Sequence, residues 1–454
     1  MSFREDSVLF KVYLAFIVLF IASLALAGGS SRDDVITYIA IEIASFFVLC
    51  LFYVGSGSQG VRAAGLPLAF LGALAALMLV QLVPLAPQLW TELPGREFYA
   101  QAAQVAGVPQ PWRPISLSPD RTVDSLLGLL PIFATALIVG SGPRRFTNWV
   151  MITVLVLAVV SVVLAVFQLS AGPDTDLRFY RFTNTDAGVG LLANRNHQAL
   201  FLAMAIPVAT WWTLTPGARV AAPAARLALG VSMIGLFLVG GILTGSRSGL
   251  LAASVAILAS VGLAWPAVKR LPVLVKALAG GALAAAGTGL VFLVLSGHRI
   301  LSQSVQEDDR SSFWPRTVEL IREFFPFGSG VGSFDRVFPR VEHLADLGPE
   351  YVNRAHNDFL EMGLEAGLFA YLLLAAFLAW WIMLSIRAWR SHPRAASDVG
   401  LARLASVIIA LGLLGSVTDY PLRTPLLGSV FCAACVVLHR RSQAPVGEAL
   451  SPRG

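Results

Sequence analysis

The sequence predicts an all-α, polytopic membrane protein of about twelve transmembrane helices, and three observations support that fold class. Of the 454 residues, 56% are hydrophobic and 13% are charged, whereas a soluble domain carries about 25% charged residues. Apolar runs of about 18 or more residues, the length that crosses a bilayer as a helix, recur along the whole chain. A spanning segment must also satisfy its own backbone hydrogen bonds, so these runs are expected to be helices.

The apolar runs follow one another in what we expect to be a single integral membrane domain over residues 1–454. The expected spans are 9–27, 35–54, 64–83, 123–141, 148–170, 197–214, 226–244, 249–265, 272–296, 357–385, 401–417 and 424–438. The first ends in Ala25-Leu26-Ala27, a pattern that resembles a signal-peptidase site. The region before it carries little net positive charge. We therefore expect this span to remain uncleaved.

Lysine and arginine orient the chain in the lipid bilayer. If the N-terminus is cytoplasmic, the inner loops and the tail hold most of the basic residues, among them Arg62, Arg144, Arg145, Arg219, Arg226, Lys269, Arg270, Arg387, Arg390, Arg394, Arg440 and Arg441. The short outer loops hold single arginines, Arg32, Arg247 and Arg423. The positive-inside rule therefore predicts that both termini are cytoplasmic. The net charge of +6 reflects this orientation, and we expect no nucleic-acid partner.

Three outer segments are longer than a turn: 84–122, 171–196 and 297–356. The last is the largest loop, and it contains an expected amphipathic helix at Ser312–Phe325. The apolar side chains that define this helix are Phe313, Val318, Ile321 and Phe325. A glycine-rich turn follows at Pro326–Gly332. It is not preceded by a strand and followed by a helix, so we do not expect it to bind a nucleotide.

Four polar motifs fall on the outer side of this topology. They are Asn194-Arg195-Asn196-His197, Gly245-Ser246-Arg247-Ser248-Gly249, the segment Asp308–Trp314, and Arg354–Asp358 with Glu361 and Glu365 after it. Arg247 lies in a turn of a few residues on the side where the positive-inside rule disfavours arginine. Asn357, Glu361 and Glu365 share a helix face by their spacing. Acids near a membrane span should point into the bundle or a wet cavity.

These residue types favour a site for a phosphorylated substrate. An arginine fork binds phosphate bidentately and stays charged. A histidine such as His356 can accept a proton from a hydroxyl near neutral pH. We find no metal-ligand motif, although Asp308 and Asp309 beside Arg310 leave a divalent-metal alternative open. Cys432 and Cys435 lie in an apolar run and are expected to be buried side chains rather than ligands.

Together the motifs resemble the O-antigen ligase and O-antigen or exopolysaccharide polymerase family of bacterial membrane glycosyltransferases, best over residues 190–425. The resemblance implies a lipid-linked-sugar glycosyltransferase bundle in the bacterial inner (cytoplasmic) membrane, with its active site on the periplasmic side. The donor would be a glycan on undecaprenyl pyrophosphate. It would pass to an acceptor hydroxyl with inversion, without a metal or another cofactor.

The resemblance also implies roles for individual residues. His356 would be the general base, and Arg247 and Arg310 would clamp the pyrophosphate. Arg195 would be an accessory contact. Asn357 belongs to the same polar cluster, and Asp358 and Glu361 would orient His356 or position the sugar.

The acceptor stays open, because members of the family transfer to the lipid A core, to another lipid-linked glycan or to a protein hydroxyl. Segment 84–122 looks like exopolysaccharide and polymerase-type members, but the motifs do not separate these activities. A transporter or flippase for a lipid-linked or polar substrate is the alternative function. It would place its polar residues near the midplane on broken helices, whereas here they gather at one face.

Overall fold

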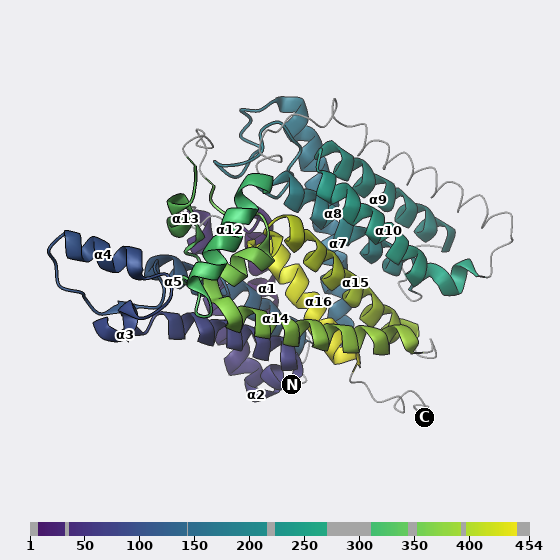
Figure 1. Ribbon diagram of the computed structural model, residues 1–454. Coiled ribbons are helices and arrows are strands. Elements are labelled where there is room, and N and C mark those ends of the chain that lie inside the picture. Colours follow the sequence, from purple (N-terminus) through teal and green to yellow (C-terminus); the bar gives the residue numbers. More distant parts are fainter. Residues whose placement is uncertain are drawn as a thin grey trace.

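The computed structural model describes residues 8–31, 36–142, 144–215, 223–269, 310–343, 352–391 and 396–442. Within these ranges the regular structure is almost entirely helical (Figure 1). The helical segments long and apolar enough to cross a membrane in the described residues are 60–81, 119–141, 147–171, 224–243, 247–265, 358–390 and 400–418. The prediction of an all-α membrane protein is therefore confirmed. The number of twelve spans is not, and the expected span 272–296 lies outside the described residues.

The N-terminal helices are α1 (Val8–Ala27) and α2 (Ile36–Gln81). The expected second and third spans thus lie in one long helical run, although Gly55-Ser56-Gly57-Ser58 lies between them. Gly65 within it has a φ of +59°, a conformation that side chains with a Cβ rarely adopt. A Cβ at Gly65 would lie 2.0 Å from Nε2 of His439. The backbone of α2 therefore lies directly against α16 (Pro425–Ser442).

Segment 84–122 is folded rather than an irregular loop. It contains β1 (Pro84–Leu85), α3 (Pro87–Thr91), α4 (Glu97–Val105), β2 (Arg113–Pro114) and the start of α5 (Pro119–Leu127). The two short strands pair antiparallel, and α3 and α4 project away from the bundle (Figure 1). The buried guanidinium of Arg96 donates to the carbonyl oxygens of Ile115 and Gly328, at 2.6 and 3.1 Å. This arginine joins the segment to the glycine-rich turn.

The bundle is built around α8. Its helices are α6 (Leu130–Ser141), α7 (Arg144–Ala171), α8 (Arg195–Leu214), α9 (Pro223–Leu243), α10 (Arg247–Val268), α15 (Ala396–Thr418) and α16. Every residue of α8 from Asn196 to Trp211 is buried, because α7, α9, α10 and α15 all pack against it. The Asn194 side chain caps its first turn by accepting from the Asn196 amide at 2.7 Å. This cap fixes where the first polar motif meets the bundle.

The expected amphipathic helix is present as α12 (Arg310–Phe324). Its buried face is formed by Phe313, Thr317, Leu320 and Phe324. The assignment of Phe325 to that face was wrong, since the side chain is 44% exposed. The helix ends one residue earlier, at Phe324, and the chain then enters the glycine-rich turn.

The helix that carries the fourth motif, α14 (Asp358–Arg390), is broken at Gly367, where φ is 58° and ψ is −135°. The glycine-rich turn fills this break. The amides of Ser329 and Gly330 donate to the carbonyl oxygens of Leu364 and Glu365, at 2.9 and 2.8 Å. Because the protein itself uses these amides, the turn does not have the open amide cradle of a nucleotide loop. The remaining short helices are α13 (Phe334–Val337), η2 (Phe338–Arg340) and η4 (Pro421–Arg423).

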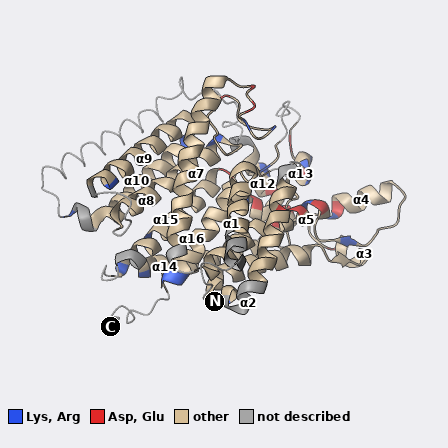
Figure 2. Cartoon of the chain, turned by 180° about the vertical axis from the view of Figure 1, so that it is seen from behind, with Lys and Arg blue, Asp and Glu red and all other residues tan. Residues whose placement is uncertain are grey.

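Charge separates the two ends of the structure. Figure 2 shows acidic residues along α5 and near α12, whereas the C-terminal end of α14 is basic. The last turn of α14 carries Arg387 and Arg390, and the last turn of α16 carries His439, Arg440 and Arg441. This separation is the pattern that the positive-inside rule would produce. The end with α5 and α12 is also the end where the polar motifs meet.

Candidate functional site

His356 lies in the segment that leads into α14, at the centre of a cluster of polar side chains from the four sequence motifs. Its Nδ1 is 3.1 Å from Oδ1 of Asp419, a residue 63 positions later in the turn between α15 and α16. The imidazole is 26% exposed, whereas the Asp419 side chain is 3% exposed. His356 also has a φ of +49°, which is uncommon for a residue with a side chain. The backbone therefore holds this histidine in a specific, strained orientation against a buried carboxylate.

The same carboxylate connects the first two motifs to His356. Asn194 and Asn196 donate to Oδ2 of Asp419 at 3.2 and 2.8 Å. The Ser246 hydroxyl donates to Oδ1 of Asn196 at 2.7 Å. His197 Nε2 lies 3.7 Å from Oδ1 of Asp419. The turn that holds Arg247 and the start of α8 are thus joined to the histidine through Asp419.

Helix α12 closes the cluster from a third direction. The indole N–H of Trp314 donates to the carbonyl oxygen of Ala355 at 2.9 Å. The ring of Phe313 lies 6.2 Å from the ring of His356, and Tyr420 packs on the imidazole at 4.9 Å. All four sequence motifs therefore meet in one cluster, the second of them through Asn196 and the others by contacts with Asp419 or with the segment around His356.

A second cluster of charges lies one helical turn further along α14. Arg423 places its three nitrogens against Asp358 Oδ1, Glu361 Oε1 and Glu365 Oε2, at 3.0, 3.2 and 3.2 Å. Arg354 Nη1 also contacts Glu361 Oε1, at 2.9 Å. Glu361 and Glu365 point into the bundle, as their shared helix face predicted. Arg423 therefore ties the turn that carries Asp419 to the helix that follows His356.

Asp419 is the carboxylate against His356, and the other role expected of Asp358 and Glu361, positioning the sugar, stays a prediction. Asp358 and Glu361 contact Arg423 and Arg354, and Asp419 contacts the histidine. Glu361 still supports the segment, because its Oε2 accepts from the Ala355 amide at 2.8 Å. Asn357 caps α14 by accepting from the amides of Phe359 and Leu360.

Electrostatics holds Asp419 and Arg423 in their charged forms. Burial alone would raise the pKa of Asp419, but His356 and His197 outweigh it and hold that pKa well below its usual range. Burial alone would lower the pKa of Arg423, but three carboxylates outweigh it and raise that pKa well above its ordinary value. The Asp419 carboxylate is therefore ionised at any physiological pH, as an acceptor for a histidine N–H must be.

The predicted arginines have different positions. Arg247 is the first residue of α10 and is half-buried, next to the Ser246 that joins the Asp419 network. Arg195 is the first residue of α8 and pairs with Asp186 at 3.5 Å. Arg310 is the first residue of α12, and its side chain lies outside the described part of the structure. Asp308 and Asp309, the open metal alternative, are also outside it.

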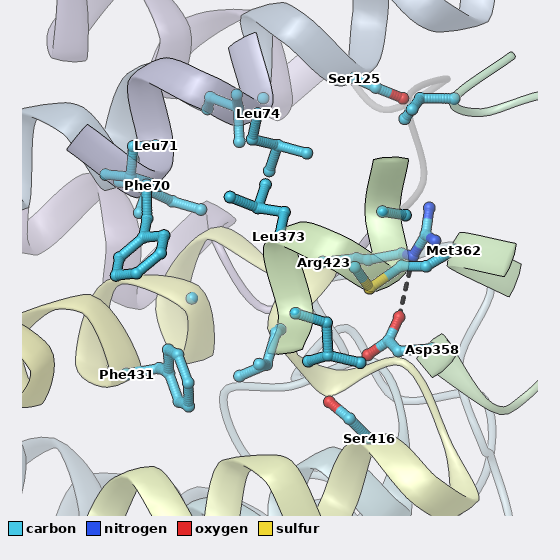
Figure 3. A pocket seen from close by; sticks show the side chains of 18 of the residues that line it. Phe70, Leu71, Leu74, Ser125, Asp358, Met362, Leu373, Ser416, Arg423 and Phe431 are labelled. Atoms are coloured by element: carbon cyan, nitrogen blue, oxygen red, sulfur yellow. Dashed lines mark hydrogen bonds and ion pairs between the residues drawn. The ribbon is translucent and has the colours of Figure 1, made fainter. Parts of the chain in front are cut away.

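A cavity of about 340 Å³ adjoins the charged cluster (Figure 3). Most of its wall is apolar and comes from α2, α14 and α16, with Phe70, Leu71, Leu74, Leu373 and Phe431 among the lining side chains. Arg354, Asp358 and Arg423 form part of its polar end. Among the described residues, no group of three His, Cys, Asp or Glu could hold a metal ion.

Asp419 and Arg423 are the residues whose roles the sequence did not assign. Both lie in the short turn between α15 and α16, which the predicted topology places on the outer side, where the positive-inside rule disfavours arginine. That signal marked Arg423 as unusual, but nothing in the sequence pairs it with three acids of α14.

Part of the chain is similar to a known protein family. Residues 232–375 match the family model described as O-antigen ligase. The matched segment contains Arg247, the glycine-rich turn and His356, while Asn194 and Asp419 lie outside it. No curated protein sequence matches the chain. The match supports the resemblance found in the sequence, and residues 232–375 are similar to the O-antigen ligase family.

Proposed function

We propose that this protein transfers a glycan from undecaprenyl pyrophosphate to an acceptor hydroxyl on the periplasmic side of the bacterial inner membrane. The family match supports glycan transfer of the O-antigen ligase or polymerase type. The observation that carries the mechanism is the contact of 3.1 Å between His356 Nδ1 and Asp419. An ionised carboxylate at Nδ1 favours the tautomer with its proton there, which leaves Nε2 able to accept a proton.

In the proposed reaction, His356 Nε2 takes the proton of the acceptor hydroxyl as its oxygen attacks the anomeric carbon. The bond from that carbon to the pyrophosphate oxygen breaks, and undecaprenyl pyrophosphate leaves with the electron pair. Attack opposite the leaving group inverts the anomeric centre. Asp419 stabilises the imidazolium that forms.

The leaving pyrophosphate gains negative charge, so it needs fixed cations. Arg247 and Arg310 are the proposed clamp, with Arg195 as an accessory contact. Arg247 is joined to the histidine by the path Ser246–Asn196–Asp419. Arg423 is a weaker candidate, because all three of its nitrogens already contact carboxylates. The proposed mechanism needs no metal ion.

Transport is the second candidate, because α2 and α14 both contain residues with non-helical φ values, Gly65 and Gly367. In transporters such breaks expose backbone groups to a substrate. Here the amides of the glycine-rich turn occupy carbonyl groups before the break at Gly367, and the Leu368 amide donates to Pro326. This break serves packing within the protein, so transfer explains the site better than transport does.

The test is glycan transfer by the protein reconstituted in liposomes, with an undecaprenyl-pyrophosphate-linked donor and separate lipid-linked, lipid A core and peptide acceptors. We expect transfer in the presence of EDTA and a loss of about 10²–10⁴-fold in His356→Gln. His343→Gln, a change at an exposed histidine, should be fully active. Product size then separates polymerase from ligase. Full activity of His356→Gln, or abolition by EDTA, would overturn the proposal and favour a metal at Asp308–Asp309.

A further inference from the structure

The cavity beside the charged cluster has the size and wall of a lipid site. Its volume of about 340 Å³ falls within the range of about 300–1,000 Å³ found for ligand pockets. Most of its apolar lining comes from α2, α14 and α16, and Figure 3 shows Phe70, Leu71 and Leu74 of α2 facing Leu373 of α14 across it. Phe431 of α16 closes a further side. A wall of this kind suits a hydrocarbon chain.

The polar end of the cavity carries more acidic than basic groups. Asp124, Asp358 and Glu365 line it together with Arg354 and Arg423. Arg423 is already bound to three carboxylates, and Arg354 is bound to Glu361. A phosphate in this place would meet carboxylates in a partly buried setting, where repulsion is poorly screened. The charge pattern thus rejects a phosphorylated head.

Two oxygen atoms at this end are suited to a ligand with hydroxyl groups. Oδ2 of Asp358 and the hydroxyl of Ser416 are buried and interact with each other, with no hydrogen bond to another residue in the described part of the structure. Both residues line the cavity (Figure 3). A sugar hydroxyl placed between them would donate to the carboxylate oxygen and accept from the serine hydroxyl. Ser125 adds a further hydroxyl at the same cavity.

We propose that this cavity binds the hydrocarbon chain of a glycolipid whose hydroxyl-bearing head carries no phosphate at the cavity's polar end. Asp358 begins α14 two residues after His356, so a head held there lies two positions along the chain from the proposed general base. Resting on the proposed function, we assign this glycolipid as the acceptor. The donor pyrophosphate then binds on the side of Arg247, away from these carboxylates.

The test is photocrosslinking in lipid nanodiscs with a diazirine-bearing prenyl glucoside, followed by peptide mapping. We expect crosslinks on α2, α14 and α16, competed by excess farnesyl glucoside and not by farnesyl pyrophosphate. Leu373→Trp fills the cavity and should weaken competition by about tenfold or more. Leu372→Trp is the matched control, because this neighbour on α14 is 58% exposed and does not line the cavity.

Equal or better competition by farnesyl pyrophosphate would overturn the proposal, since the cavity would then accept a phosphorylated head. So would crosslinks elsewhere, or equal binding by the Leu373→Trp and Leu372→Trp variants. Binding is measured without glycan transfer, so the two proposals fail separately. Transfer without this binding would refute the cavity alone, and binding to a protein inactive in transfer would refute the proposed function alone.

Discussion

Replacing Arg423 by glutamine tests whether the charged cluster holds the site together. In the wild type this guanidinium contacts Asp358, Glu361 and Glu365 at 3.0, 3.2 and 3.2 Å. The side chains of Glu361 and Glu365 are 0% and 1% exposed, so water cannot replace the lost partner. Arg423→Gln leaves Arg354 as the cation of the cluster against three carboxylates. Removing one partner of a buried ion pair costs about 3–5 kcal/mol, and we expect a loss of that size in the free energy of unfolding.

The assay is SDS-induced unfolding in mixed micelles, followed by tryptophan fluorescence. Arg387→Gln is the control, because this arginine is exposed at the far end of the same helix, and it should change stability by about 0.5 kcal/mol or less. The double variant Arg423→Gln/Glu365→Gln restores the original charge balance. It should therefore show a favourable coupling energy of about 1–3 kcal/mol. A loss below about 1 kcal/mol in Arg423→Gln, or strict additivity in the double variant, would refute the reasoning.

Three further predictions concern the free energy of unfolding, measured by the same SDS-induced unfolding assay. Gly367→Ala should destabilise the protein strongly, because φ is 58° and the added Cβ would lie 2.1 Å from the Pro326 oxygen. Gly72→Ala is the control and should be neutral, because nothing lies within 4 Å of an added Cβ there. Equal effects of the two changes would contradict this account. Trp314→Phe removes the hydrogen bond to Ala355 and should cost about 1 kcal/mol, so an unchanged unfolding midpoint would count against it. Asp419 has a pKa well below its usual range, so its contribution to stability is complete above its unfolded pKa of about 4. That contribution is lost as pH falls through the lower folded value, so equal acid sensitivity of the wild type and Asp419→Asn below about pH 4 would contradict this account.

Local pattern was enough to predict most of the helices. The runs around α7, α9 and α10 are long and apolar, and the structure places helices there. The third and fourth motifs were predicted to lie on one side, and they now contact each other through Trp314 and Ala355. Such features follow from sequence because periodicity and span length are local properties.

The pairings within the site are not local, and sequence reasoning missed them. His356 and Asp419 are 63 residues apart, and Asn196 reaches the same aspartate from 223 residues away. The resemblance implied that Asp358 and Glu361 would orient His356 or position the sugar, and it gave no role to Asp419. The break of α14 at Gly367 depends on a loop packing into it, which helix propensity cannot indicate.

The most direct test of the central claim is a double-mutant cycle on the rate of glycan transfer in reconstituted membranes, with His356→Gln, Asp419→Asn and both together. If Asp419 acts through the histidine, His356→Gln should slow transfer by about 10²–10⁴-fold, and the double variant should be no slower than His356→Gln alone. If the two losses multiply in the double variant, or if either single variant keeps the wild-type rate, the two residues do not act as one general base.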